Sequence, residues 1–144
     1  MTKSFLFTAF LILAAGCTSN EKSPLEGTWR CVSSGSVQFS DTTFKAMAEN
    51  GMIKTFSKEY FTFVGHITND TLTLDEFGAG TYTLEGNKYE EFIIYHDIKS
   101  LIGKRFKAVD EIKNDTLIHR FNTDNVDSWK LEKGYVTEKF VRVK

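Results

Sequence analysis

Short segments with the residue pattern of β-strands, separated by two-residue turn signals, occupy most of this 144-residue chain. Tyr82 and Leu84 show the alternation of apolar residues that a half-buried strand needs, and Phe140 with its neighbours shows it again near the end. Asn, Asp and Gly suit the backbone angles of tight hairpin turns. Such pairs recur at Asn69-Asp70, Gly86-Asn87, Asn114-Asp115 and Lys133-Gly134. The pattern predicts an all-β domain, an antiparallel barrel or sandwich of about eight to ten strands.

The individual elements can be predicted from the same patterns. We expect one short helix at residues 40–51, because Asp41 or Thr42 can cap its start, Phe44 and Met47 share a face, and Gly51 suits its end. The remaining elements are expected to be strands, at residues 27–33, 53–57, 59–68, 71–75, 80–85, 88–96, 105–113, 116–121, 128–133 and 136–143.

The first residues of the chain have the organisation of a secretory signal. Lys3 supplies a positive charge, residues 5–15 are almost purely apolar, and small residues precede Cys17. The apolar run is roughly ten residues long, whereas a membrane-spanning helix needs about 20. We therefore do not expect a permanent transmembrane helix.

The sequence Ala14-Ala15-Gly16-Cys17 resembles the lipobox of bacterial lipoprotein signals. In that family the cysteine thiol receives a diacylglyceryl group and the preceding residues are removed, which implies a signal peptide at 1–16 and a lipid on Cys17. Leu13 lies one place further from the cysteine than the family prefers. Acyl chains would hold the domain on a membrane of the bacterial cell envelope. Thr18, in place of the Asp that marks inner-membrane retention in enteric bacteria, favours the outer membrane.

The rest of the chain is predicted to be a polar tether at 17–24 and one domain at 25–144. Removal of residues 1–16 takes away one charge, that of Lys3, and leaves 128 residues with a net charge of −2. This balance gives no reason to expect a nucleic-acid partner. With Cys17 acylated, Cys31 is the only thiol left, so we expect no intramolecular disulfide and a small, buried, unreactive Cys31.

Three stretches of the domain are similar to lipocalin-type barrels. The triplet Gly27-Thr28-Trp29 resembles the Gly-x-Trp that opens the first strand in that superfamily, and residues 80–91 and 134–144 resemble parts of small bacterial lipocalin-like domains. In the superfamily an arginine of the last strand packs over this tryptophan, which implies a structural Trp29–Arg142 pair. The resemblance implies a small lipocalin-like β-barrel that binds a ligand, and it implies no particular activity or cofactor. The chain lacks the disulfide cysteines of secreted lipocalins.

The interior of such a barrel is the expected place for a ligand. Eight strands leave room either for packed side chains or for one small ligand. Alternation places Tyr89, Glu91 and Tyr95 on one face of their strand. Together with Trp29 and Tyr82, they are the candidate lining of a pocket for a small apolar or amphipathic ligand. The alternative is that these aromatic side chains simply pack together as a core.

Glu91 is the candidate polar anchor of this pocket. If it points inward, its carboxylate needs partners, which Tyr hydroxyls or the guanidinium of Arg105 or Arg120 can supply. If the strand faces the other way, Phe92 and Ile94 lie inside and Glu91 lies in water.

Patterns for catalysis or metal binding are scarce. His66, His96 and His119 lie on three different predicted strands and lack close metal-ligand spacing. Neighbouring carboxylates such as Glu90 and Glu91 face opposite sides of a strand, so they cannot act as an acid–base pair. We therefore predict a protein that is not an enzyme and holds no metal or cofactor. The first hypothesis is a ligand-binding envelope lipoprotein, and the alternative is a protein-interaction or structural lipoprotein with a filled barrel.

Overall fold

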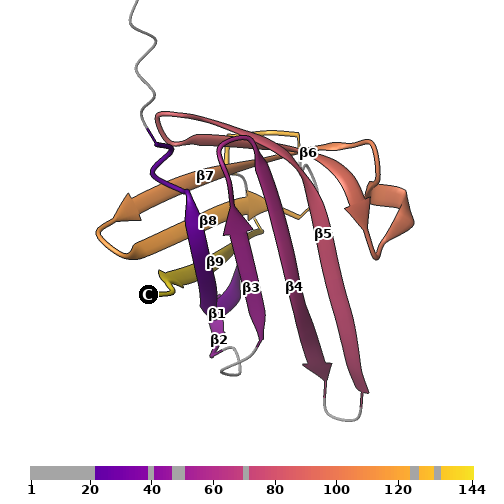
Figure 1. Ribbon diagram of the computed structural model, residues 1–144. Coiled ribbons are helices and arrows are strands. Elements are labelled where there is room, and N and C mark those ends of the chain that lie inside the picture. Colours follow the sequence, from indigo (N-terminus) through magenta and orange to yellow (C-terminus); the bar gives the residue numbers. More distant parts are fainter. Residues whose placement is uncertain (1–21, 39–40, 47–50, 70–71, 124–126, 132–133) are drawn as a thin grey trace, which may run out of the picture.

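A computed structural model describes residues 22–38, 41–46, 51–69, 72–123, 127–131 and 134–144 (Figure 1). These residues form nine strands and one short 3₁₀ helix, η1 (Lys99–Leu101). The strands are β1 (Gly27–Gln38), β2 (Asp41–Ala46), β3 (Met52–Phe56), β4 (Tyr60–Asn69), β5 (Leu72–Glu85), β6 (Lys88–His96), β7 (Arg105–Lys113), β8 (Thr116–Asn122) and β9 (Tyr135–Arg142).

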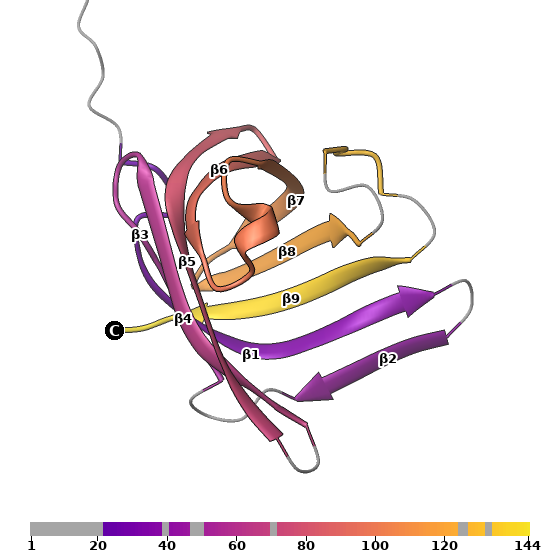
Figure 2. The same cartoon turned by 90° about the vertical axis from the view of Figure 1, so that its right-hand side faces the viewer.

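The strands form one antiparallel sheet that closes into a barrel. From β3 to β9 each strand pairs with the next one in the chain, while β1 pairs with β3 on one side and with β9 on the other. The closed ring therefore contains β1 and β3 to β9, and β2 lies beside the second half of β1 as an added strand (Figure 2). The predicted all-β antiparallel barrel is confirmed, and the sandwich alternative is excluded.

Two of the predicted hairpin turns join strands as expected. Gly86 has a φ of 62° between the paired residues Glu85 and Lys88, and Asn114 has a φ of 54° between Lys113 and Thr116. These left-handed conformations are the ones that Gly and Asn adopt most easily. The predicted turn at Asn69-Asp70 lies between the paired residues Asn69 and Leu72, although Asp70 itself falls outside the described residues.

The predicted helix at residues 40–51 is wrong. Asp41–Ala46 forms β2, which pairs with Ser33–Gln38 of β1. The pairing of β1 with β3 ends at Arg30, so the second half of β1 would otherwise present an unpaired edge. Thr42 and Thr43 are β-branched and suit a strand. Tertiary pairing has overridden the helical pattern here, and residues 47–50 lie outside the described part of the chain.

The predicted strands at 71–75 and 80–85 are a single long strand, β5. Gly78 and Gly80 are buried residues of this strand, at points where neighbouring groups approach its backbone closely. Glycine is the residue that permits this close approach.

The predicted strand at 128–133 is also wrong for its described part, 128–131, which is irregular and bends at Trp129 and Lys130. The side-chain amide of Asn122 donates to the carbonyl oxygens of Ser128 at 3.2 Å and Lys130 at 2.9 Å. The indole N–H of Trp129 donates to the carbonyl oxygen of Tyr89 at 2.8 Å. Side-chain hydrogen bonds thus hold this segment against the barrel where a sheet ladder was expected. Gly134, with a φ of 90°, precedes β9, while Lys133 lies outside the described residues.

A dense core fills one part of the barrel. Its most deeply buried side chains include three aromatic residues from different strands, Phe61, Tyr89 and Phe140, together with Leu117 and Cys31. Cys31 is a free thiol that is 1% exposed, and burial raises its pKa to about 12. The expectation of a buried, unreactive Cys31 therefore agrees with its environment. Among the described residues no helix is both long enough and apolar enough to cross a membrane.

Candidate ligand-binding cavity

Trp29 and the segment before it are tied to β9 through Arg142. The guanidinium carbon of Arg142 lies 4.1 Å from the centre of the Trp29 ring, and the indole N–H donates to the carbonyl oxygen of Leu25 at 2.7 Å. Arg142 also donates to the carbonyl oxygens of Glu26 at 2.5 Å and Pro24 at 2.8 Å. The structure thus brings together the two residues of the expected Trp–Arg pair. Their contact combines cation–π attraction with hydrogen bonds that tie the chain entry to the last strand.

Gly27 explains the first position of the Gly-x-Trp motif. Its φ is 124°, which L side chains rarely adopt, and a Cβ atom there would lie 2.8 Å from Nη1 of Arg142. A glycine at this position therefore leaves room for the guanidinium over the Trp29 ring.

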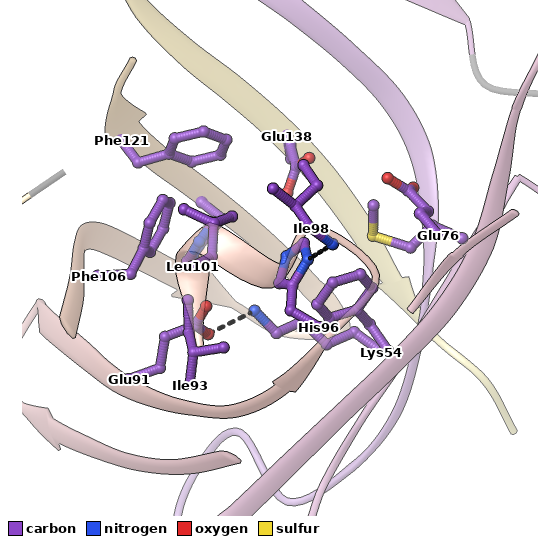
Figure 3. Close-up of a pocket in the computed structure, with 13 residues that line it drawn as sticks. Lys54, Glu76, Glu91, Ile93, His96, Ile98, Leu101, Phe106, Phe121 and Glu138 are labelled. Atoms are coloured by element: carbon purple, nitrogen blue, oxygen red, sulfur yellow. Dashed lines mark hydrogen bonds and ion pairs between the residues drawn. The ribbon is translucent and has the colours of Figure 1, made fainter. Parts of the chain in front are cut away.

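Further along the barrel lies a cavity of about 220 Å³ (Figure 3). Its apolar lining comes from Met52, Phe63, Ile93, Ile98, Leu101, Phe106 and Phe121. Its polar lining comes from Lys54, Glu76, Glu91, His96, His119 and Glu138. Leu101 belongs to η1 and Ile98 precedes it, so the connection between β6 and β7 contributes part of the cavity wall. A mainly apolar pocket with a few converging polar groups is the usual form of a small-molecule site.

Two glycines of β5 shape the wall beside Phe63. A Cβ atom at Gly78 would collide with the Phe63 ring, and one at Gly80 would collide with the carbonyl oxygen of Phe92 and approach the Phe61 ring. The missing side chains let these rings lie against β5. The aromatic wall of the cavity thus depends on glycine at position 78.

Glu91 points inward and belongs to a buried hydrogen-bonded group. Its Oε2 atom accepts a hydrogen bond from the Tyr89 hydroxyl at 2.6 Å. The same atom forms an ion pair with Nζ of Lys54 at 3.1 Å. The Lys54 ammonium also lies 5.1 Å from the centre of the Tyr89 ring. Burial, together with the Glu91 charge, raises the pKa of Tyr89 well above its usual value. Tyr89 therefore stays protonated and acts as a donor to the carboxylate.

A second buried pair joins Asp110 and His119. Nδ1 of His119 donates to Oδ1 of Asp110 at 2.6 Å, and the two side chains are 1% and 4% exposed, His119 being the more exposed. The His119 ring packs against the rings of Tyr89 and Phe121, with centroids 5.1 and 5.6 Å away. The other oxygen of Asp110, Oδ2, is buried and has no hydrogen-bond partner among the described residues. This arrangement fixes the orientation of the imidazole ring at the cavity wall.

Two further carboxyl groups line the cavity, Glu76 from β5 and Glu138 from β9. Burial raises the pKa of Glu76, and the nearby charge of Glu138 raises it further. Burial likewise raises the pKa of Glu138, against the opposing effect of the positive charges of His119 and Lys54. Both groups therefore hold their protons to a higher pH than a carboxyl in water.

The structure separates the five candidate pocket residues into three groups. Glu91 lines the cavity. Trp29, Tyr82 and Tyr89 are buried in the core beside it, where Tyr82 donates to the carbonyl oxygen of Ser57 at 2.8 Å. Tyr95 is 66% exposed. Trp29, Tyr82 and Tyr89 therefore form part of a packed aromatic core, which is the alternative that the sequence left open, and they do not line the cavity.

The inward position predicted for Tyr95 is wrong because β6 contains a bulge. Gly80 pairs with Ile93 and Ala79 pairs with Tyr95, so Ile94 is an extra residue in the ladder. An extra residue reverses the alternation beyond it. His96 consequently faces the cavity in place of Tyr95.

The residues that sequence reasoning missed lie between apolar residues of the same strand face. Lys54 lies between Met52 and Phe56, and all three are at least partly buried. His119 lies in the same way between Leu117 and Phe121, and Glu138 lies two residues before the buried Phe140. Alternation extended to polar residues would have placed all of them inside. The suggested Glu91 partners Arg105 and Arg120 instead pair with Glu90 and Glu111 on the outer surface.

The three histidines do not converge. His96 and His119 line the cavity, whereas the side chain of His66 is 45% exposed and lies 3.9 Å from Asp75. Within the described ranges no group of three or more His, Cys, Asp or Glu side chains has the geometry to hold a metal ion.

Comparison with solved structures places the barrel among known folds. A lipocalin-like protein from Bacteroides uniformis ATCC 8492 superimposes with a TM-score of 0.52 at 15% identity, covering 83% of this chain and 98% of that one. An uncharacterized protein from Bacteroides eggerthii DSM 20697 gives a TM-score of 0.51 at 11% identity, covering 83% and 99%. No protein-family model and no curated protein matches the sequence. Identities this low show a shared architecture and carry no activity, so the conclusion concerns structure: the protein has a lipocalin-like β-barrel fold.

Proposed function

We propose that this protein is a lipid-anchored lipoprotein of the bacterial cell envelope whose barrel binds a small amphipathic ligand. The observation that carries the binding role is the cavity of about 220 Å³, which combines aromatic walls with buried ionisable groups. The proposed role is binding rather than catalysis.

The proposed anchor is a lipid on Cys17, with the outer membrane as the proposed location. Its support is the sequence pattern at residues 3–17, which lies outside the described part of the structure. Mass spectrometry of the intact protein from a lipoprotein-processing host tests this. A mass that includes acyl chains and lacks residues 1–16 supports the anchor, and loss of membrane association in Cys17→Ala supports it independently.

Native mass spectrometry of the full purified chain tests the binding role. We expect an additional non-covalent mass of a small molecule, released as the collision energy rises. Ile93→Trp, at a cavity position that is 3% exposed, should fill the space and remove this mass. Ile94→Trp is the matched control, since Ile94 is 37% exposed on the outside of the bulge. The proposal would be contradicted if the purified protein carried no ligand, or if Ile93→Trp left the bound mass unchanged.

A protein-interaction role is the second candidate, and a specific feature of the outer surface favours it. Val64 and Phe77 are paired across β4 and β5 and are 59% and 50% exposed, and Tyr95 on the adjacent β6 is 66% exposed. Exposed apolar side chains grouped in this way are a common feature of interaction surfaces. Crosslinking in cells should then recover a partner that is lost in Phe77→Ser but retained in Ile93→Trp.

A further inference from the structure

The cavity lining contains three acidic groups, Glu76, Glu91 and Glu138, and three basic groups, Lys54, His96 and His119. Each basic group already contacts a carboxylate: Lys54 contacts Glu91 at 3.1 Å, His96 contacts Asp97 at 2.9 Å, and His119 contacts Asp110 at 2.6 Å. Glu76 and Glu138 line the same cavity, and in the part of the chain that the structure describes neither carboxyl forms an ion pair. Once these three pairs are matched, Glu76 and Glu138 remain without a matching cation among the described residues.

One of these groups is also short of a hydrogen-bond partner. Oε1 of Glu76 is buried and accepts no hydrogen bond within the described residues. A buried carboxyl oxygen without a partner is costly, so an unfilled acceptor at a cavity wall is a place where a ligand donor gains binding energy. Figure 3 shows Glu76 and Glu138 reaching the cavity from different strands, with His96 of β6 and Lys54 of β3 nearby.

We propose that the cavity binds a small organic cation, a protonated amine with a short apolar or aromatic body. This inference rests on the proposed ligand-binding function and names the class of ligand. The ammonium group, with three N–H donors, would lie between Glu76 and Glu138. The apolar body would lie against Phe63, Phe106 and Phe121, whose rings offer both apolar contact and cation–π attraction.

The size and charge of the cavity argue against other ligands. Drug-sized pockets are roughly 300–1,000 Å³, so a cavity of about 220 Å³ takes a short body. An anionic head group would need Lys54, His96 or His119 as its partner, and each of them already contacts a carboxylate. It would also meet Glu76 and Glu138. A neutral ligand would leave the two carboxyl groups uncompensated.

Three probes of matched shape and different charge test the proposal: 2-phenylethylamine, 2-phenylethanol and 3-phenylpropanoate. Binding is measured by isothermal titration calorimetry at pH 7.5 with the full chain in nanodiscs of zwitterionic lipid, and empty nanodiscs serve as the blank. We expect the amine to bind at least tenfold more tightly than the alcohol, and the carboxylate more weakly than both.

Substitutions identify the groups responsible. Glu76→Gln and Glu138→Gln should each reduce amine affinity about tenfold and leave alcohol affinity unchanged. Glu111→Gln is the control, because Glu111 pairs with Arg120 outside the barrel. Each variant is checked for a native melting transition, and the two glutamates are tested separately so that one unstable variant does not decide the result.

The outcomes separate this inference from the proposed function. Equal binding of amine and alcohol, or tighter binding of the carboxylate, overturns the cation preference while the ligand-binding function stands. Amine binding that survives both Glu76→Gln and Glu138→Gln overturns the assigned groups. Absence of binding by all three probes, together with a ligand-free native mass spectrum, overturns the proposed function as well.

Discussion

Tyr89 connects the core of the barrel to its cavity. Its ring is fully buried among aromatic neighbours, and its hydroxyl donates to Glu91, which lines the cavity. Lys54 is the other partner of that carboxylate. Buried ionisable groups are tolerated when each has partners of this kind, and the loss of one partner leaves a charge poorly solvated.

Removal of the Tyr89 hydroxyl is therefore expected to destabilise the fold. Tyr89→Phe should lower the free energy of unfolding by about 1–3 kcal/mol, because Glu91 loses a buried donor while the ring packing stays intact. Urea unfolding followed by circular dichroism measures the change. Tyr95→Phe is the matched control, since that side chain is 66% exposed and should change stability by less than about 0.5 kcal/mol. Equal effects of the two variants would contradict the buried hydrogen bond.

Glu138 gives the fold a dependence on pH. Burial raises the pKa of its carboxyl in the folded state above the usual 4.5. In the pH range between 4.5 and this higher pKa, the folded protein therefore binds more protons than the unfolded chain. Stability contributed by this group is therefore lost as the pH rises through that window. Glu138→Gln should flatten the fall in melting temperature from pH 4.5 upward and make the variant the more stable protein at pH 8. Glu111→Gln should follow the wild-type curve, and an unaltered profile in Glu138→Gln would refute the assignment.

At the scale of the strands, β5 and β6 determine where the cavity lies. Gly78 lets the Phe63 ring lie against β5, and the bulge at Ile94 turns His96 inward and Tyr95 outward. Both features are local departures from regular alternation. They leave the barrel closed while they change which side chains line it.

A side chain at position 78 should disturb this packing. Gly78→Ala places a Cβ atom into the Phe63 ring and should cost about 1–3 kcal/mol of unfolding free energy, the usual penalty for overpacking a core. A smaller neighbour should relieve the collision, so the double variant Gly78→Ala/Phe63→Leu should be less destabilised than the two single changes added together. Chemical denaturation of the four proteins measures this coupling. Simple additivity would show that the ring does not occupy the space against β5.

The sequence predicted the regular elements well and the irregular ones poorly. The bounds predicted for β6 and β7 are those observed, because their alternation and turn residues are local signals. β2 was predicted as a helix since its residues follow a helical pattern, and its pairing with β1 depends on contacts that no local pattern contains. The bulge that turns Tyr95 outward is likewise set by the partner strand, where Gly80 closely approaches the Phe92 backbone.

At the scale of the whole molecule, the contact between Trp29 and Arg142 joins the two ends of the sheet. The two residues are directly opposite each other in the pairing of β1 with β9. Family resemblance predicted this pair, and alternation offered the inward position of Glu91 as one of two possible facings. The cavity itself was not located, because Lys54, His119 and Glu138 come together only when the barrel closes.

The planar geometry of the Arg142 guanidinium should contribute more to the stability of the fold than its positive charge does. Arg142→Lys keeps the positive charge but loses the planar fork that donates to Glu26 and Pro24 while stacking on Trp29. We expect a loss of about 1–3 kcal/mol in unfolding free energy. Arg120→Lys, at an outer-surface pair with Glu111, is the control and should be nearly neutral. Comparable stability of the two variants would show that a positive charge at position 142 suffices.

The pairing of β1 with β9 also determines when the barrel can close during synthesis. Arg142 donates to a carbonyl group 116 residues earlier in the chain, so the ring cannot close until β9 has been synthesised. Contacts between such distant segments carry a large loop-closure entropy and fold slowly. Until then β1 and β8 both present bare edges, which are prone to pair with other chains. These two edges therefore stay exposed until β9 has paired with both strands.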